Sequence, residues 1–163
     1  MGSHNYALDG GRRFFCFYNN QRYYLACHRL YDYDKYDNES TKLNFHNNGT
    51  LRGENFSYEN FGNEKFCLYY KDNDDYNMKN WMLYIHKDQN AEYFTPLFHK
   101  NNCSQFILEN ADNNFVYIKE VNYNVYLYLN DSKKRDSDSK GTSFYAGAST
   151  EKDKATKFRI EDI

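Results

Sequence analysis

The sequence lacks the features that mark several large classes of protein. It has one proline in 163 residues, and no apolar run approaches the roughly 20 residues of a membrane-spanning helix. The formal net charge is −2 at pH 7, so no sequence-wide basic field attracts nucleic acid. A small basic cluster at residues 133–135 is flanked by aspartates that cancel most of its field. We therefore predict neither a nucleic-acid partner nor a membrane span.

Motifs of catalysis and of metal binding are also missing. The sequence contains no Cys-x-x-Cys, no His-Glu-x-x-His, no phosphate-binding loop and no serine nucleophile motif. The acidic stretch 32–39 spaces its carboxylates like a cation loop, but it lacks the glycine and the distal glutamate of a calcium loop. We predict a protein that is not an enzyme, with no catalytic residues, no metal and no cofactor.

The four cysteines are too sparse for a disulfide-built scaffold. A hairpin that turned at Gln21-Arg22 would place Cys16 opposite Cys27. Directly opposed strand positions often strain a disulfide, so we expect reduced thiols. Cys67 and Cys103 are typical of small core residues.

Residues 1–11 form a polar lead-in with no apolar signal region, and Gly2-Ser3-His4 resembles a cloning remnant. A signal peptide removed before this point is compatible with the sequence. The compartment of this soluble chain therefore stays open, with the cytoplasm slightly favoured over secretion.

Aromatic residues are abundant and favour strands. They make up 20% of the chain, with 18 Tyr and 13 Phe, and they alternate with polar residues in many short segments. Gly- and Asn-rich turns separate these segments. The predicted strands are 14–18, 22–28, 42–46, a strand carrying Phe56 and Tyr58, 65–70, 80–86, 93–99, 105–109, 115–119, 124–129, 142–146 and 157–160. An all-β protein is therefore expected.

Three stretches of the chain are related to one another. Residues 54–60, 104–110 and 156–162 each read polar, polar, Phe, variable, large apolar, acid, Asp or Asn. Their phenylalanines are about 50 and 52 residues apart, a period typical of repeat architectures. After the lead-in we therefore predict one domain, 12–163, built from repeats at about 12–63, 64–113 and 114–163 with four strands each.

This pattern of repeats resembles the β-trefoil superfamily over essentially the whole chain. The resemblance implies a six-stranded barrel capped by three hairpins around a pseudo-threefold axis. Ricin-B-like lectins carry Gln-x-Trp in the fourth strand of each repeat, whereas here the aromatic residue is Phe56, Phe106 or Phe158. The residue two positions before it is Glu54, Ser104 or Thr156, never Gln. The branch therefore stays open between ricin-B-like lectins and fascin-like, growth-factor-like or interleukin-like proteins.

Tyrosines beside Asn and Asp suggest sugar recognition. An aromatic face stacks on the C–H surface of a sugar, and amides or carboxylates satisfy its hydroxyls. A general enrichment of Asn, Tyr and Asp by AT-rich codons is the competing explanation. We predict lectin-like binding of a carbohydrate or glycoprotein by hairpin-turn and loop residues. The candidates are Tyr31, Tyr33, Asn38, Asp72, Asp75, Tyr76, Asn122, Tyr123 and Asn124.

The alternative function is protein interaction, cytokine-like or cytoskeletal and actin-binding. It would use the polar excursions 31–41, 72–78 and 131–140, which interrupt the repeats at unequal places.

Overall fold

Segments in which aromatic and polar residues alternate form strands in a computed structural model of the chain. The structure describes residues 12–27, 40–47, 56–62, 64–70, 82–88, 93–138 and 141–162. Within these ranges the strands are β1 Arg12–Tyr18, β2 Gln21–Cys27, β3 Ser40–His46, β4 Phe56–Gly62, β5 Lys65–Tyr70, β6 Met82–Lys87, β7 Phe94–His99, β8 Phe106–Asn110, β9 Val116–Glu120, β10 Val125–Asp138, β11 Gly141–Ser149 and β12 Arg159–Asp162. Two short 3-10 turns, η1 Asp112–Asn114 and η2 Lys152–Lys154, are the helical segments of this part of the chain. The all-β prediction is confirmed.

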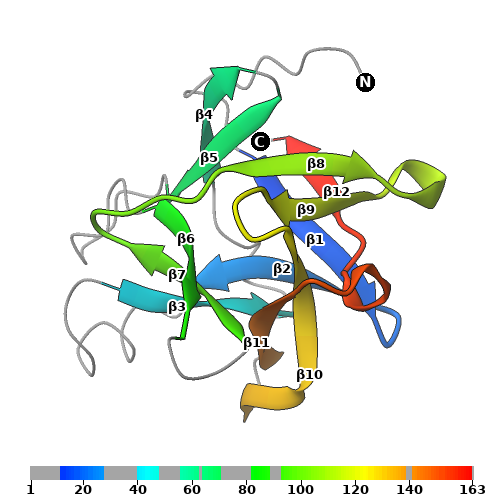
Figure 1. Ribbon diagram of the computed structural model, residues 1–163. Helices are drawn as coiled ribbons and strands as arrows, with labels where there is room; N and C mark the ends of the chain where they lie inside the picture. The colour runs from blue at the N-terminus through cyan, green and yellow to red at the C-terminus, as the bar shows by residue number, and fades with distance from the viewer. Residues whose placement is uncertain are drawn as a thin grey trace.

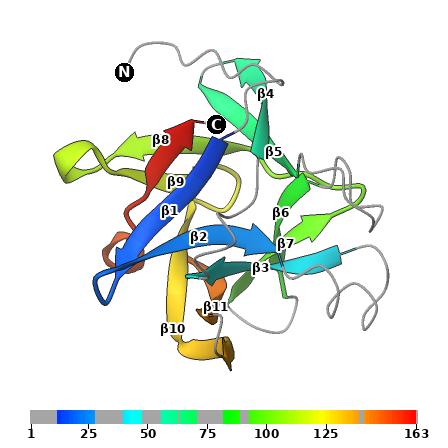
Figure 2. The ribbon, with the colours of Figure 1, turned by 180° about the vertical axis from the view of Figure 1, so that it is seen from behind.

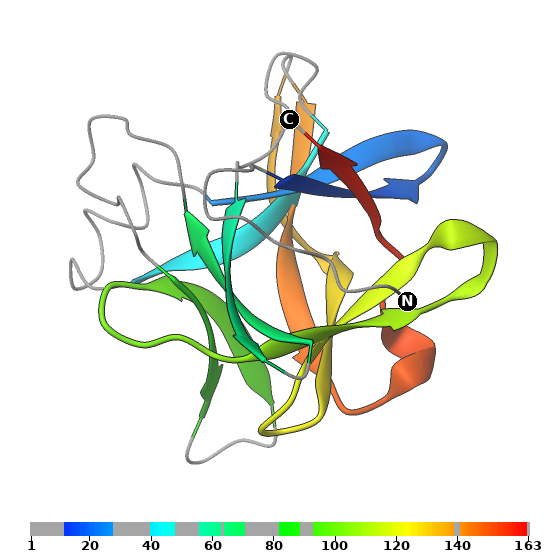
Figure 3. The same ribbon diagram turned by 90° about the horizontal axis from the view of Figure 1, so that it is seen from above.

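The strands pair antiparallel into one sheet that closes on itself (Figure 1). Pairing runs from β10 through β9, β8, β5, β4, β1, β2 and β3 to β11, and β11 pairs again with β10. The additional strands β6, β7 and β12 attach to this ring, with β12 along β1 (Figure 2). The β1–β2 and β8–β9 hairpins project away from the centre in the view from above (Figure 3). The fold is a closed antiparallel β-barrel with extra strands.

The prediction of a three-fold β-trefoil is therefore wrong. The three phenylalanines of the repeat do pair at related places, since the register joins Arg12 to Phe56, Phe66 to Phe106 and Val116 to Phe158. The segments around them are unequal, because β10 has 14 residues whereas β6 has 6, and β12 has 4 whereas β4 has 7. The alternation of side chains predicts single strands, but long-range pairing decides how many residues each strand contains.

The excursion predicted at 131–140 is one source of this inequality. Its described residues, 131–138, continue β10, and Ser137 and Asp138 pair with Thr142 and Gly141 of β11. The polar composition of the segment predicts a loop, but pairing with β11 supplies backbone partners whatever the side chains are.

The first hairpin turns between the predicted strands 14–18 and 22–28, two residues before the Gln21-Arg22 centre that would pair Cys16 with Cys27. Its turn is Asn19-Asn20, and both residues have positive φ, 49° and 62°. Asparagine tolerates this left-handed backbone, which the tight hairpin turn requires at both central positions. Cys16 consequently lies opposite Tyr23, and Cys27 lies opposite Leu43. Cys16 is a free, buried thiol, as expected, and burial raises its pKa to about 12.

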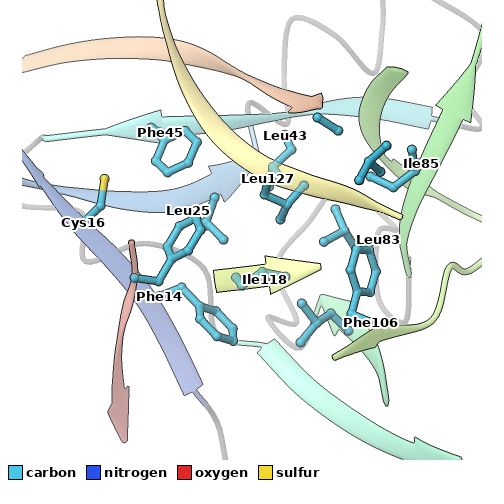
Figure 4. Close-up of a cluster of buried hydrophobic side chains, with 14 of the residues drawn as sticks. Phe14, Cys16, Leu25, Leu43, Phe45, Leu83, Ile85, Phe106, Ile118 and Leu127 are labelled. Atoms are coloured by element: carbon cyan, nitrogen blue, oxygen red, sulfur yellow. The ribbon is translucent and has the colours of Figure 1, made fainter. Parts of the chain in front are cut away.

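Inward-facing residues from all sides of the barrel form one core (Figure 4). Phe158 is fully buried in this core, stacked on Phe45 at 5.8 Å and edge-on to Phe14 at 6.3 Å between ring centroids. Phe106 is also fully buried. In the described ranges no helix has the length and apolar character needed to cross a membrane.

Candidate functional site

The residues predicted from the sequence divide into two groups. Six of them lie outside the described residues: Tyr31, Tyr33, Asn38, Asp72, Asp75 and Tyr76. The other three, Asn122, Tyr123 and Asn124, form the turn between β9 and β10.

Contacts inside the β9–β10 turn explain its composition without a ligand. The buried carboxylate of Glu120 accepts hydrogen bonds from the backbone N–H groups of Asn122 at 2.6 Å and Tyr123 at 2.9 Å. Asn124 has a φ of 56°, a backbone conformation that asparagine tolerates. The Tyr123 ring packs on Phe94 of β7, with 5.2 Å between centroids. The turn is therefore a packed structural element, and its residues do not line the pocket described next.

A hollow of about 250 Å³ lies where β3, β7, β10 and β11 meet. We call it the Tyr128 pocket. Its aromatic lining includes Tyr93, which is 58% exposed, and the half-buried Tyr128 and Tyr145. Its volume lies just below the range of about 300–1,000 Å³ found for sites of drug-sized ligands, so it suits a ligand of about one ring.

Small residues of β11 open this space. Ala146, Gly147 and Ala148 line the pocket, and Gly147 lies directly opposite Tyr128 in the β10–β11 register. A Cβ atom on Gly147 would come within 2.6 Å of the Tyr128 hydroxyl oxygen and would also overlap the ring. The absence of a side chain at position 147 therefore lets the far end of the Tyr128 ring approach β11 closely.

An irregularity in β10 brings polar groups to the same pocket. Leu129 pairs with Ala146, and the next pair is Lys134 with Phe144. Between these two pairs β10 therefore contains more residues than β11, which is a β-bulge. The Asn130 carboxamide oxygen accepts hydrogen bonds from the backbone N–H of Ser132 at 3.2 Å and from its hydroxyl at 2.7 Å. These bonds hold the bulge, from which both Asn130 and Lys133 reach the pocket.

The pocket is cationic. Lys42 of β3 and Lys133 of β10 line it, and the Lys42 ammonium lies 5.0 Å from the centroid of the Tyr145 ring. Among the lining residues, all of which belong to the described ranges, none carries a carboxylate. The neighbouring Asp131 accepts a hydrogen bond from the Tyr18 hydroxyl at 3.2 Å. Desolvation and this carboxylate together raise the pKa of Tyr18.

A second surface feature lies at the β1–β2 hairpin. Phe17 is 52% exposed and meets Phe115 edge-on at 6.4 Å between centroids. Two guanidinium groups cover the neighbouring rings, Arg22 at 4.4 Å from Phe15 and Arg159 at 4.6 Å from Phe115. We call these five residues the aromatic–arginine patch.

Glu109 has the surroundings of a structural carboxylate. It accepts a hydrogen bond from the Tyr126 hydroxyl at 2.9 Å and pairs with Lys152 at 3.1 Å and Lys119 at 3.3 Å. Desolvation acts to raise its pKa, but the bonds from Lys152, Tyr126 and Lys119 outweigh it, so the pKa lies below its ordinary value. Three donors already occupy this carboxylate, which makes it a poor general acid. Over the described part of the chain, no three His, Cys, Asp or Glu residues gather as metal ligands.

No protein-family model matches the chain, and a search of curated proteins found no match.

Sequence reasoning missed the Tyr128 pocket because its walls combine the β10–β11 hairpin with β3 and β7, which are distant from it in sequence. One signal was available, since Tyr126-x-Tyr128-x-Asn130 leads into the polar excursion that differs between the repeats.

Proposed function

We propose that this protein is a non-catalytic binding module that recognises a carbohydrate in the Tyr128 pocket. The observation that carries the proposal is the grouping of three tyrosines around a hollow of one-ring size, with the Asn130 amide at its edge. The predicted class of function is kept, but the site moves from the hairpin turns to the junction of β3, β7, β10 and β11.

The lining offers partners for the apolar C–H surface of a sugar and for its hydroxyl groups. Rings of Tyr93, Tyr128 and Tyr145 offer aromatic faces to the C–H surface of a pyranose, which water solvates poorly. The Asn130 oxygen already accepts two hydrogen bonds from Ser132, so this side chain offers its NH2 group as a donor. The Thr95 hydroxyl can donate or accept, and together the two groups suit sugar hydroxyls. A shallow site that covers one ring supports weak binding, so we expect a monosaccharide Kd of about 1 mM, equivalent to about 4 kcal/mol.

Glycan-array binding, followed by calorimetric titration of the best monosaccharide, tests the proposal. Tyr93→Ala is the principal variant, because Tyr93 is 58% exposed and its truncation should leave the fold intact. We expect Tyr93→Ala and Tyr145→Ala each to weaken binding by about tenfold, or 1.4 kcal/mol.

Tyr84→Ala is the matched control. Tyr84 is a half-buried tyrosine of β6 that packs on His99 at 5.6 Å and does not line the pocket. Its truncation should leave sugar affinity unchanged. Silence of the whole array, or full affinity in both pocket variants, would refute carbohydrate recognition at this site.

Protein interaction is the second candidate function, and the aromatic–arginine patch favours it. Aromatic residues and arginine are enriched where protein interfaces bind most tightly. Phe17 is half exposed, Arg22 lies 6.0 Å from its ring centroid, and Arg159 covers the neighbouring Phe115 ring. If the protein binds no glycan on the array, cross-linking and affinity capture with wild type and Phe17→Ala would identify this function. Capture that Phe17→Ala does not reduce would argue against the patch.

A further inference from the structure

We infer that the ligand of the Tyr128 pocket is an acidic sugar, whose carboxylate or sulfate group binds between Lys42 and Lys133. This inference rests on the proposed carbohydrate function and specifies the class of sugar.

The sign of the pocket is opposite to that of the chain. The whole chain has a formal net charge of −2. The lining of the pocket, by contrast, contains two charged residues, and both are lysines. A neutral sugar needs no such lining, because amides and hydroxyls satisfy its hydroxyl groups. An anionic substituent forms charge-assisted hydrogen bonds with ammonium groups, and these are about twice as strong as neutral ones.

Two independent features hold the lysines at the pocket. Lys42 lies over the Tyr145 ring, and this cation–π contact orients its ammonium beside an aromatic wall of the pocket. Lys133 stands on the bulge that the Asn130–Ser132 hydrogen bonds hold. Residues 130 and 133 would point to opposite faces of a regular strand, so the bulge is what combines an amide and an ammonium in one site.

The aspartates beside Lys133 in sequence weaken its field at long range, but Asp131 is not among the residues that line the pocket. Asp131 is engaged by the Tyr18 hydroxyl, and Tyr18 does not line the pocket. An aromatic wall that receives the sugar ring and two ammonium groups that receive its acidic substituent therefore come together in one hollow.

Calorimetric titration with matched sugars tests this inference. The probes are D-glucuronic acid, glucose 6-sulfate, D-glucose as the neutral parent, and inorganic sulfate, at ionic strengths of about 0.01 M and 0.15 M. We expect both acidic sugars to bind about tenfold more tightly than glucose at low salt, as charge-assisted bonds allow. We expect the difference to shrink as salt screens the lysines.

Charge variants locate the effect. Lys133→Gln and Lys42→Gln should each reduce the affinity ratio of glucuronic acid to glucose severalfold, and Lys133→Arg should restore most of it. Lys157→Gln is the control, because it removes one positive charge from an exposed lysine that pairs with Asp112 outside the pocket.

The outcomes separate the two proposals. Equal affinities for glucose and glucuronic acid would overturn the acidic-sugar inference and leave carbohydrate recognition standing. Inorganic sulfate that binds as tightly as glucose 6-sulfate would show a site for free anions and overturn both. Failure of every sugar to bind would overturn the proposed function, and the inference would fall with it.

Discussion

Replacement of Gly147 by alanine is the sharpest test of how the pocket is built. Gly147 and Tyr128 are direct partners in the β10–β11 register, and Gly147 is buried. An added Cβ would lie within 2.6 Å of the Tyr128 hydroxyl oxygen, a distance that real Cβ atoms do not tolerate. Because the overlapped atoms belong to the far end of the tyrosine, we expect the ring to swing away from β11.

Two opposing effects set the magnitude. Forcing extra volume into a packed site costs about 1–3 kcal/mol. Replacing glycine by alanine also restricts the unfolded chain, which favours folding by about 0.4–1 kcal/mol where the backbone accepts alanine. The first effect is larger, so we expect a net loss of about 1–2 kcal/mol in the free energy of unfolding. For a chain of this length this corresponds to a fall in Tm of about 2–8 °C.

Thermal unfolding of a double-mutant cycle measures this effect. Wild type, Gly147→Ala, Tyr128→Ala and the double variant would be compared by calorimetry. Tyr128→Ala removes the atoms that the new methyl group would contact. In that background Gly147→Ala should therefore not lower the free energy of unfolding. An equal loss of stability in both backgrounds would refute the argument, because the strain would then lie in the β11 backbone. Carbohydrate binding should be lost in Gly147→Ala if the Tyr128 ring forms part of the site.

The remaining predictions concern the core, a carboxylate and a thiol. Phe106→Ala and Phe158→Ala should each lower the free energy of unfolding by about 3–5 kcal/mol, measured by urea denaturation, because both rings are fully buried; an unchanged midpoint in both would contradict the core assignment. The pKa of Glu109 lies below its ordinary value of 4.5, so its stabilising contribution is present above pH 4.5 and is lost as pH falls through the lower, folded-state pKa. Stability measured against pH should therefore fall less steeply on the acid side in Glu109→Gln than in wild type, and identical slopes would count against the Glu109 pairs. Because Cys16 is buried and its pKa is near 12, it should resist iodoacetamide at pH 8 in the native protein. The half-buried Cys103 should react before it, as mass spectrometry of the labelled protein would show. Labelling of Cys16 ahead of Cys103 would contradict the burial of Cys16.

The strands could be predicted because their signal is local. A segment such as β9 alternates buried and half-buried side chains along its length, and alternation is visible in sequence. The burial of Phe106 and Phe158 also followed from their matching positions in the repeated stretches. These features depend on neighbours a few residues away or on comparison of one stretch with another.

The register and the closure of the barrel could not be predicted in the same way. The sequence predicts a turn between strands 14–18 and 22–28, but the centre of that turn, and with it the register of the hairpin, follows from the positive φ angles of Asn19 and Asn20. A shift of two residues in that turn removes Cys27 from its expected place opposite Cys16. The repeat pattern likewise suggested three equal units, although the length of each strand depends on the partner it meets.

The candidate site arises where the regular pattern is broken. A strand in strict alternation would direct only every second residue of β10 to one side, and the Tyr128 pocket would then have an amide or an ammonium, not both. The bulge after Leu129 removes that restriction, and the glycine at position 147 removes a side chain that would otherwise fill the space. Lys42 arrives from β3, whose register with β7 puts it opposite Leu97, because the sheet closes on itself. Function in this barrel is therefore expected where its segments differ, and the segment that differs most, β10, contributes the tyrosine, the amide and one of the two cations.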